Sequence, residues 1–322
     1  MADILKYRIP GSDIVSQIGY FREIQSLKEV KGFFISTFLK DRMIEFIPSS
    51  NNSEGKSTFF SNEPYVISKE DYLKDAKNFI NLFEEKKIKK AVFSRVKKIA
   101  FDESKINELF ASLCDTYPKA FCYLVSGESI GTWIGATPEI LIHAFSNSGF
   151  TMSLAGTKSI QDKDKPWGEK ELLEQAYVTG FIQDKLLTSG IKELYINGPY
   201  DVEAGPVIHL KTDISFDIDQ SKVVELAKSI HPTPAVCGLP QKEATEIINF
   251  REPHDREFYT GMIGLISLKA TNLFVNLRCC QIQKGNAYLY LGGGFTKDSN
   301  PLDEWNETEN KSRTLLNVMD KL

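Results

Sequence analysis

The sequence predicts an α+β fold in which most strands pair antiparallel. Short apolar or alternating runs follow one another directly, and patterns typical of amphipathic helices separate only some of them. A doubly wound nucleotide-binding fold needs a regular alternation of strand and helix, which this chain lacks. The expected strands cover residues 32–39, 90–101, 121–127, 140–146, 149–157, 262–268, 273–282 and 287–294, and the expected helices cover 70–87, 103–116, 168–188, 221–229, 241–250 and 301–321.

Composition excludes several classes of function. With 322 residues the chain can bury an ample core, and its formal net charge of -4 and isoelectric point near 5.8 predict no nucleic-acid partner. No apolar run approaches a bilayer span and no secretory signal opens the chain, so we expect a cytoplasmic protein without membrane association. The five cysteines form no Cys-x-x-Cys pair, which predicts neither a zinc site nor a disulfide framework.

Two pairs of glutamates share one spacing on expected helices. Glu171 and Glu174 lie three residues apart in WGEKELLEQ, as do Glu304 and Glu307 in EWNETENK. Residues three apart on a helix are neighbours on one face, roughly 5–6 Å apart at Cβ. Paired carboxylates suit Mg²⁺, which takes oxygen ligands and keeps several waters. Taken alone, each pair is more simply explained as a solvated helix face.

A run of three glycines, Gly292 to Gly294, ends an apolar stretch just before the second glutamate pair. Glycine lets the backbone approach a ligand closely, and it also makes tight turns from strand to loop. The run alone does not decide between these two interpretations.

Two ionisable residues stand at the edges of expected strands. Lys90 begins KAVFSR, and burial against its apolar neighbours would lower the proton affinity of the lysine and make it a general base. The charged stretch EEKKIKK, which ends at Lys90, favours the alternative of a solvated lysine without a chemical role. Glu139 follows a Thr-Pro dipeptide and precedes an apolar run. A partly apolar pocket would keep this carboxyl protonated as a general acid, and a turn residue without chemistry is the alternative.

Two further polar residues stand in unusual surroundings. His231 lies in HPTPAVCGLP, where the prolines stiffen a loop that also holds Thr233. A single histidine in such a loop is more often a structural anchor than a catalyst. Arg278 interrupts an apolar run, and a buried arginine needs an anion, supplied either by the protein or by a substrate.

Eight strings together resemble one known family. In order, they are KAVFSR, GATPE, LAGT, HPTPAVCGLP, EPHDREFYTGMIG, LRC, LYLGGG and EWNETENK, and they extend from about residue 66 to the C-terminus. These strings resemble the chorismate-utilising enzymes. The HPTPAVCG loop is most similar to that of isochorismate synthases, since anthranilate and aminodeoxychorismate synthases usually have a loop like GTVSGAPK.

The resemblance implies a fold and a domain organisation. The family fold, like that of anthranilate synthase component I, is a layered α/β/β/α arrangement of two large, mostly antiparallel sheets flanked by helices. We expect residues 66–322 to form the chorismate-binding catalytic part and residues 1–65 a weakly matched N-terminal part of a single structural domain. The polar stretch at 47–64 is loop-like, which suggests a peripheral N-terminal segment.

The resemblance also implies a reaction. Enzymes of the family that add water have a lysine at the position of Lys90, and Ala155-Gly156-Thr157 stands where aminodeoxychorismate synthases carry a catalytic lysine. Lys90 would activate water for attack at ring carbon C2, and Glu139 would protonate the departing C4 hydroxyl. The enzyme is then an isomerase, an isochorismate synthase, that feeds menaquinone or siderophore biosynthesis.

The family's binding residues carry over in the same way. Glu174 and Glu307 match the main Mg²⁺ carboxylates, and Glu171 and Glu304 match more distant or water-mediated ligands. For the substrate, Arg278, Gly292 and Lys311 match contacts to the carboxylates of chorismate, and Gly156, Thr157 and His231 match residues that line the pocket.

Some expectations stay open at this point. A salicylate synthase, which would also eliminate pyruvate, and a catalytically silent chorismate-binding protein are the alternatives. We expect a monomer without a glutamine amidotransferase subunit. The chain departs from many relatives at Gln175, where they have histidine, and at Gly293, where alanine is common.

Overall fold

The computed structural model describes residues 2–50, 55–60, 62–204 and 207–322. Within these ranges the six expected helices are confirmed, with ends that shift by a few residues at most. They are α1 (Lys69–Glu85), α2 (Ile106–Thr116), α3 (Glu169–Thr188), α4 (Gln220–Ile230), α5 (Gln241–Arg251) and α6 (Pro301–Met319). None of the helices in the described part of the chain is both long and apolar enough to cross a membrane.

The strands form one continuous hydrogen-bonded order in which every ladder between them is antiparallel, as predicted. In chain order they are β1 (Asp3–Arg8), β2 (Val15–Glu23), β3 (Phe33–Ser36), β4 (Met43–Pro48), β5 (Lys90–Ala100), β6 (Phe121–Gly127), β7 (Gly131–Thr137), β8 (Ile140–Phe145), β9 (Ser148–Ser159), β10 (Tyr195–Ala204), β11 (Val207–Asp217), β12 (Gly238–Leu239), β13 (Met262–Ile266), β14 (Ala270–Val275), β15 (Cys279–Gln283) and β16 (Asn286–Phe295).

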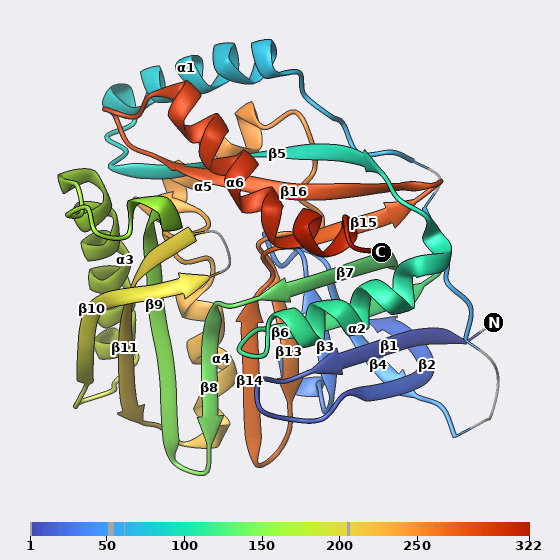
Figure 1. Cartoon of the computed structure of the whole chain (residues 1–322). Helices are drawn as coiled ribbons and strands as arrows, with labels where there is room; N and C mark the ends of the chain where they lie inside the picture. The colour runs from blue at the N-terminus through green and yellow to red at the C-terminus, as the bar shows by residue number, and fades with distance from the viewer. Residues whose placement is uncertain (1, 51–54, 61, 205–206) are drawn as a thin grey trace.

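This sheet curls so that its two halves face each other. The rings of Phe121 in β6 and Phe274 in β14 stack with centroids 4.6 Å apart, although β13, β3, β4, β2 and β1 lie between those strands in the hydrogen-bonded order. Figure 1 shows β9, β8 and β14 running across the direction of β7, β15 and β16. The two expected sheets are therefore the halves of one curled sheet.

Helices cover the outer face of each half. One apolar cluster packs α3 and α4 against β8, β9 and β11, and another fills the space between the two halves. Two more clusters lie under α2 and α6 and under α1 and α5. The layers thus follow the predicted α/β/β/α order, because each helix buries one apolar face on the sheet.

The N-terminal strands are not peripheral. β1 to β4 occupy the middle of the strand order and join its two halves. The expectation of a peripheral segment was wrong, because the polar loop before α1 separates elements that pack into one core. The boundary at residue 65 stays a prediction.

One expected strand is in fact two strands. Residues 273–282 divide into β14 and β15, which lie in different halves of the sheet. The chain crosses between the halves at Asn276–Arg278, and Arg278 has φ +50 in the left-handed region. The apolar pattern continues on both sides of the break, so the sequence suggested one strand.

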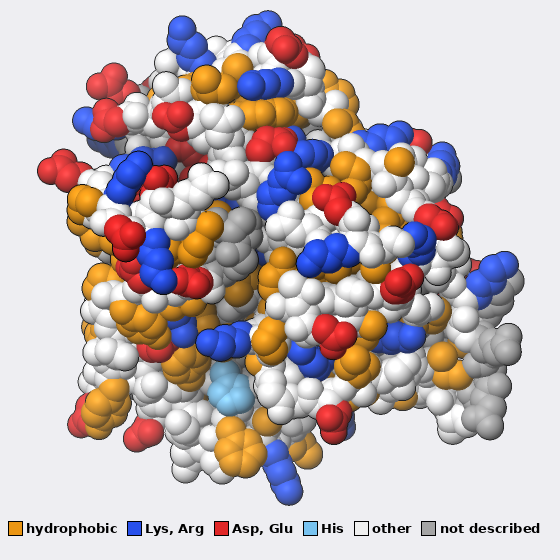
Figure 2. Space-filling view, in the orientation of Figure 1, with side chains coloured by type: hydrophobic (Ala, Val, Ile, Leu, Met, Phe, Trp, Pro, Cys, Tyr) orange, Lys and Arg blue, Asp and Glu red, His pale blue; other side chains and the backbone are white. Residues whose placement is uncertain are grey.

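Figure 2 shows basic and acidic side chains interspersed over one face of the molecule, in keeping with the small net charge.

Candidate active site

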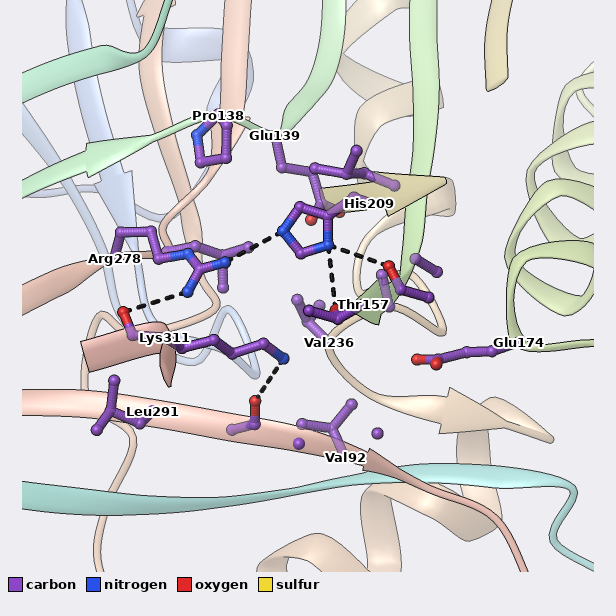
Figure 3. A pocket seen from close by; sticks show the side chains of 18 of the residues that line it. Val92, Pro138, Glu139, Thr157, Glu174, His209, Val236, Arg278, Leu291 and Lys311 are labelled. Carbon is purple, nitrogen blue, oxygen red and sulfur yellow. Dashed lines mark hydrogen bonds between the residues drawn. The ribbon is translucent and has the colours of Figure 1, made fainter. Parts of the chain in front are cut away.

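A cavity lies where the two halves of the sheet meet α3 and α6. Polar and apolar residues from both halves of the sheet and from the two helices line it. Of the residues predicted for the site, those that line the cavity are Glu139, Gly156, Thr157, Glu174, Arg278, Gly292 and Lys311. Figure 3 shows Arg278, His209, Lys311 and Glu174 around this space.

Arg278 and His209 form the polar centre of one wall. Arg278 Nη2 lies 3.3 Å from His209 Nε2, and His209 Nδ1 lies 3.1 Å from the Gly156 carbonyl oxygen (Figure 3). The carbonyl can only accept, so Nδ1 carries the proton and Nε2 accepts from Arg278. Burial, with the charges of Arg278 and Lys311, lowers the pKa of His209 to about 3. His209 is therefore neutral and orients the guanidinium of Arg278.

Gly156 makes this arrangement possible. It lies at φ +68 at an irregularity in the pairing of β9 with β11, where the register shifts between His209 and Leu210. A Cβ at Gly156 would lie 3.1 Å from the Glu171 carbonyl oxygen, so a glycine lets β9 pass close to α3. The hydroxyl oxygen of Thr157, the next residue, lies 3.1 Å from His209 Nδ1.

Lys311 reaches the cavity from α6. That helix begins at Pro301 with Asn300 as its N-cap, whose side chain accepts from the backbone N–H of Leu302. Lys311 Nζ donates to the Gly292 carbonyl oxygen at 2.9 Å and lies 2.6 Å from Glu307 Oε1, one turn earlier. Lys311 and Arg278 together present two positive charges to one cavity.

The three glycines allow other side chains to approach the sheet closely. They lie inside β16, paired with β5, and do not form a turn after it. A Cβ at Gly293 would lie 2.9 Å from Glu304 Oε2, and one at Gly294 would lie 2.5 Å from Glu174 Oε1. Gly293 and Gly294 are thus each required by a glutamate that packs on the strand, whereas a Cβ at Gly292 would lie 2.9 Å from the Tyr259 hydroxyl oxygen.

Lys90 and Glu174 form an ion pair behind Gly294. Lys90 Nζ is 0% exposed and lies 2.7 Å from Glu174 Oε1. Among the described residues the ammonium makes this ionic contact but no hydrogen bond of good geometry. Lys90 does not line the cavity itself and reaches it through Glu174.

Glu139 is the buried acid of the site. It follows β7 and is 4% exposed. Burial raises its pKa to about 7, although Lys90, Lys311 and Arg278 act in the opposite direction. This raised pKa lets the carboxyl keep its proton closer to neutral pH, as a general acid requires.

The other three glutamates lie beside the cavity. Glu304 is 1% exposed, and its Oε1 accepts from Ser299 Oγ at 2.9 Å and lies 2.5 Å from Lys170 Nζ. Burial and the charge of Glu307 raise the pKa of Glu304 to about 7. Burial also acts on Glu307, but Lys311 and Lys170 outweigh it and lower its pKa. The side chain of Glu171 turns towards Gly168 at the start of α3.

Three of the four predicted metal carboxylates are thus held by lysines: Glu174 by Lys90, Glu304 by Lys170 and Glu307 by Lys311. In the described ranges no three His, Cys, Asp or Glu side chains gather closely enough to hold a metal ion in this arrangement.

One predicted residue lies elsewhere. His231 ends α4, and its Nε2 lies 2.8 Å from the Thr260 carbonyl oxygen. It is buried and is not among the described residues that line the cavity, so the structure gives it the role of an anchor. The histidine that does line the cavity is His209. It was missed because its strand, β11, was not predicted, although VIHLKTDISF alternates as a strand should.

Gln175, a departure from many relatives, has a structural role here. Its Oε1 accepts from the backbone N–H of Ala155 at 3.0 Å, and its Nε2 donates to the hydroxyls of Ser153 and Thr212. These bonds fix α3 on β9 and β11, which places Glu174 over the cavity.

Comparison with known proteins identifies the family. The family model described as "Chorismate binding enzyme" matches residues 30–320. The chain belongs to the chorismate binding enzyme family. This match begins well before residue 66, where the strings that resemble the family start, and includes β3 and β4.

Members of the chorismate binding enzyme family with similar sequences are named isochorismate synthases. Isochorismate synthase MenF of Bacillus subtilis is 28% identical over 293 residues, which cover 87% of this chain and 62% of that protein. Isochorismate synthase EntC of Escherichia coli is 30% identical over 244 residues, which cover 72% of this chain and 62% of that protein. The chain thus spans about three-fifths of the length of these curated relatives.

Solved structures of the family share the fold. The putative 2,3-dihydroxybenzoate-specific isochorismate synthase DhbC from Bacillus anthracis superposes with a TM-score of 0.82 and 24% identity, covering 99% of this chain and 96% of that one. At 24% identity this likeness establishes the fold alone, so the activity must be inferred from the residues of the site.

Proposed function

We propose that the chain is an isochorismate synthase that converts chorismate to isochorismate with Mg²⁺. The observation that carries this proposal is the placement of a buried carboxyl, Glu139, in the same cavity as the cationic groups of Arg278 and Lys311, with Lys90 behind Glu174. The raised pKa of Glu139 supports it as the acid. Chorismate is a dianion, and the two cations neutralise and orient its carboxylates. The names of the relatives agree with this reaction.

The reaction needs one base and one acid. For this step Lys90 must first give up the proton through which it pairs with Glu174; its amine then accepts a proton from water while the water oxygen bonds to ring carbon C2. The ring double bonds shift, and the C4–oxygen bond breaks as Glu139 gives its proton to the departing hydroxyl. One water enters and one leaves, so the reaction is an isomerisation. Each proton-transfer group typically contributes about 10²–10⁴-fold.

The carboxylates fit a Mg²⁺ ion in their chemistry. All four candidate ligands are oxygen donors, and Glu304 Oε2 is buried without a hydrogen-bond partner among the described residues. Burial and the charge of Glu307 raise the pKa of Glu304 to about 7, which supports the proposal of a cation beside this pair. Glu174 and Glu307 would hold the ion, with Glu171 and Glu304 acting directly or through water. The ion would supply charge for the ring carboxylate of chorismate.

Further features of the proposal follow from the same family. The product would feed menaquinone or siderophore biosynthesis. All five cysteines are free and buried, which agrees with a reducing cytoplasm. We propose a monomer that works without a glutamine amidotransferase subunit, because water is the nucleophile.

Product analysis tests the proposal. Purified protein is incubated with chorismate and MgCl₂, and the products are separated by chromatography. Isochorismate alone supports the proposal, salicylate with pyruvate supports a salicylate synthase, and unchanged chorismate overturns both. A parallel incubation with excess EDTA should stop turnover.

A further inference from the structure

Lys170 lies beside the proposed metal site but has no part in the reaction described above. It is the second residue of α3, and its Nζ lies 2.5 Å from Glu304 Oε1. The charges of Glu307 and Glu174 also act on it, so this ammonium interacts electrostatically with three of the four candidate metal ligands. Lys170 is not among the described residues that line the cavity.

Ionised Glu304 needs a positive charge beside it when no metal is bound. A carboxylate that is 1% exposed is costly to ionise unless a positive charge is close. Ser299 gives it one hydrogen bond, and Lys170 gives it charge. An ammonium at this position repels a second cation, since like charges a few ångströms apart in a partly buried site interact strongly.

The three lysines paired with these glutamates differ in their freedom to leave. Lys90 is fully buried, and Lys311 is also bound to the Gly292 carbonyl oxygen in the cavity. The side chain of Lys170 is 33% exposed, so it can turn into solvent when its carboxylate takes another partner. Lys170 is therefore the lysine best placed to exchange with a metal ion.

We propose that Lys170 is an internal cation that competes with Mg²⁺ for Glu304 and its neighbours, stabilises the metal-free protein and lowers its affinity for the ion. This inference rests on the metal site of the proposed function. It makes Lys170 a residue that sets the Mg²⁺ concentration at which the site fills.

Calorimetric titration of the metal-free protein with MgCl₂, without chorismate, tests the inference. Lys170→Met should bind Mg²⁺ roughly tenfold more tightly than the unchanged protein, because one opposing charge is gone. Lys170→Arg keeps the charge and should stay within about twofold. Lys163→Met is the matched control, since it removes a lysine that is 61% exposed and paired with Glu203 on the surface. Equal or weaker Mg²⁺ binding by Lys170→Met overturns the inference.

Thermal melting gives a second readout. In EDTA, Lys170→Met should melt at a lower temperature than the unchanged protein, because Glu304 loses its counter-charge. Saturating Mg²⁺ should reduce or reverse this difference in melting temperature, since a ligand stabilises the protein more when it binds more tightly. Equal melting in EDTA contradicts the role in the metal-free protein.

The metal site and the role of Lys170 are contradicted by different results. If the unchanged protein takes up Mg²⁺ and Lys170→Met is no tighter, the Lys170 inference alone is wrong. If neither protein takes up Mg²⁺, the metal assignment is wrong, and the inference is wrong with it.

Discussion

Lys90 Nζ lies 2.7 Å from Glu174 Oε1, so the proposed base and a proposed metal ligand are the two halves of one ion pair. Lys90 comes from β5 and Glu174 from α3, and they meet behind Gly294. A buried ammonium depends on its counter-charge. A metal cation bound to Glu174 would therefore also reduce the negative charge that stabilises the ammonium of Lys90.

Replacing Lys90 tests the base. Lys90→Ala should lower kcat by about 10³-fold or more, because water loses its proton acceptor. Chorismate binding, measured by calorimetry, should persist, since Arg278 and Lys311 remain. Lys89→Ala removes an exposed neighbouring lysine and should behave as the unchanged protein. Near-normal turnover by Lys90→Ala would show that another group activates water.

Glu139 predicts a pH dependence. Its pKa of about 7 means that the acid form is lost as pH rises through 7, so kcat/KM should fall above that pH. Glu139→Gln should abolish this fall in kcat/KM above pH 7 together with most of the activity. A profile that stays flat from pH 6 to about 9 would contradict the acid assignment.

The same carboxyl also affects stability. Its folded-state pKa lies above the unfolded value, so its contribution is complete below about pH 4 and is lost as pH rises through 7. Glu139→Gln removes the buried charge and should raise the free energy of unfolding by about 1–3 kcal/mol at pH 8, with little change near pH 4. Denaturant unfolding at both pH values measures this difference.

Gly294→Ala tests the close packing of β16 against α3. The new Cβ would lie 2.5 Å from Glu174 Oε1 and 3.1 Å from Lys90 Cε, so the ion pair must move. We expect activity to fall by roughly 10²-fold, as for other displacements of about 1 Å. Gly180→Ala is the control, because a Cβ there meets no atom within 4 Å and alanine favours the helix. Equal activity of the two variants would count against the role of Gly294.

His209→Leu tests the orientation of Arg278. The guanidinium loses a hydrogen-bond acceptor, and we expect KM for chorismate to rise about tenfold with a smaller change in kcat. His143→Leu replaces an exposed histidine in β8 and should leave both constants unchanged. An unaltered KM in His209→Leu would contradict the orienting role.

Glu307→Gln tests the metal site. The half-saturating Mg²⁺ concentration should rise about tenfold or more when a carboxylate ligand becomes an amide. Glu309→Gln, in the same helix, removes an acid that pairs with Arg95 and Lys97 on the other side of α6. It should lower stability and leave the Mg²⁺ titration unchanged. Identical titrations of the two variants would remove Glu307 from the metal site.

Local patterns in the sequence were sufficient to predict the helices. Polar caps such as Ser68 and Asn300, followed by amphipathic spacing, mark where α1 and α6 begin. The strands that were not predicted are β1, β2, β4, β7, β10, β11 and β12. The alternation in β11 could have been recognised, whereas β12 has only two residues and gives no pattern. The break at Arg278 was hidden because apolar residues continue on both sides.

The candidate site could be predicted in part. The glycine run pointed to the strand on which Glu174 and Glu304 pack, whereas the lysine partners of the glutamates could not be foreseen, and the metal site stays a prediction. Lys90 with Glu174 and Lys170 with Glu304 each join two elements far apart in the chain, and no local pattern records such a pairing. His209 was missed because β11 was not predicted, and its contact with Arg278 joins two strands far apart in the chain.

The central claim is that water attacks C2 while the C4 hydroxyl leaves. Turnover of chorismate in ¹⁸O-labelled water, followed by mass spectrometry of the product, tests it most directly. The account predicts isochorismate that carries one ¹⁸O atom, located at the C2 hydroxyl. Isochorismate without the label, or no isochorismate at all, would contradict it.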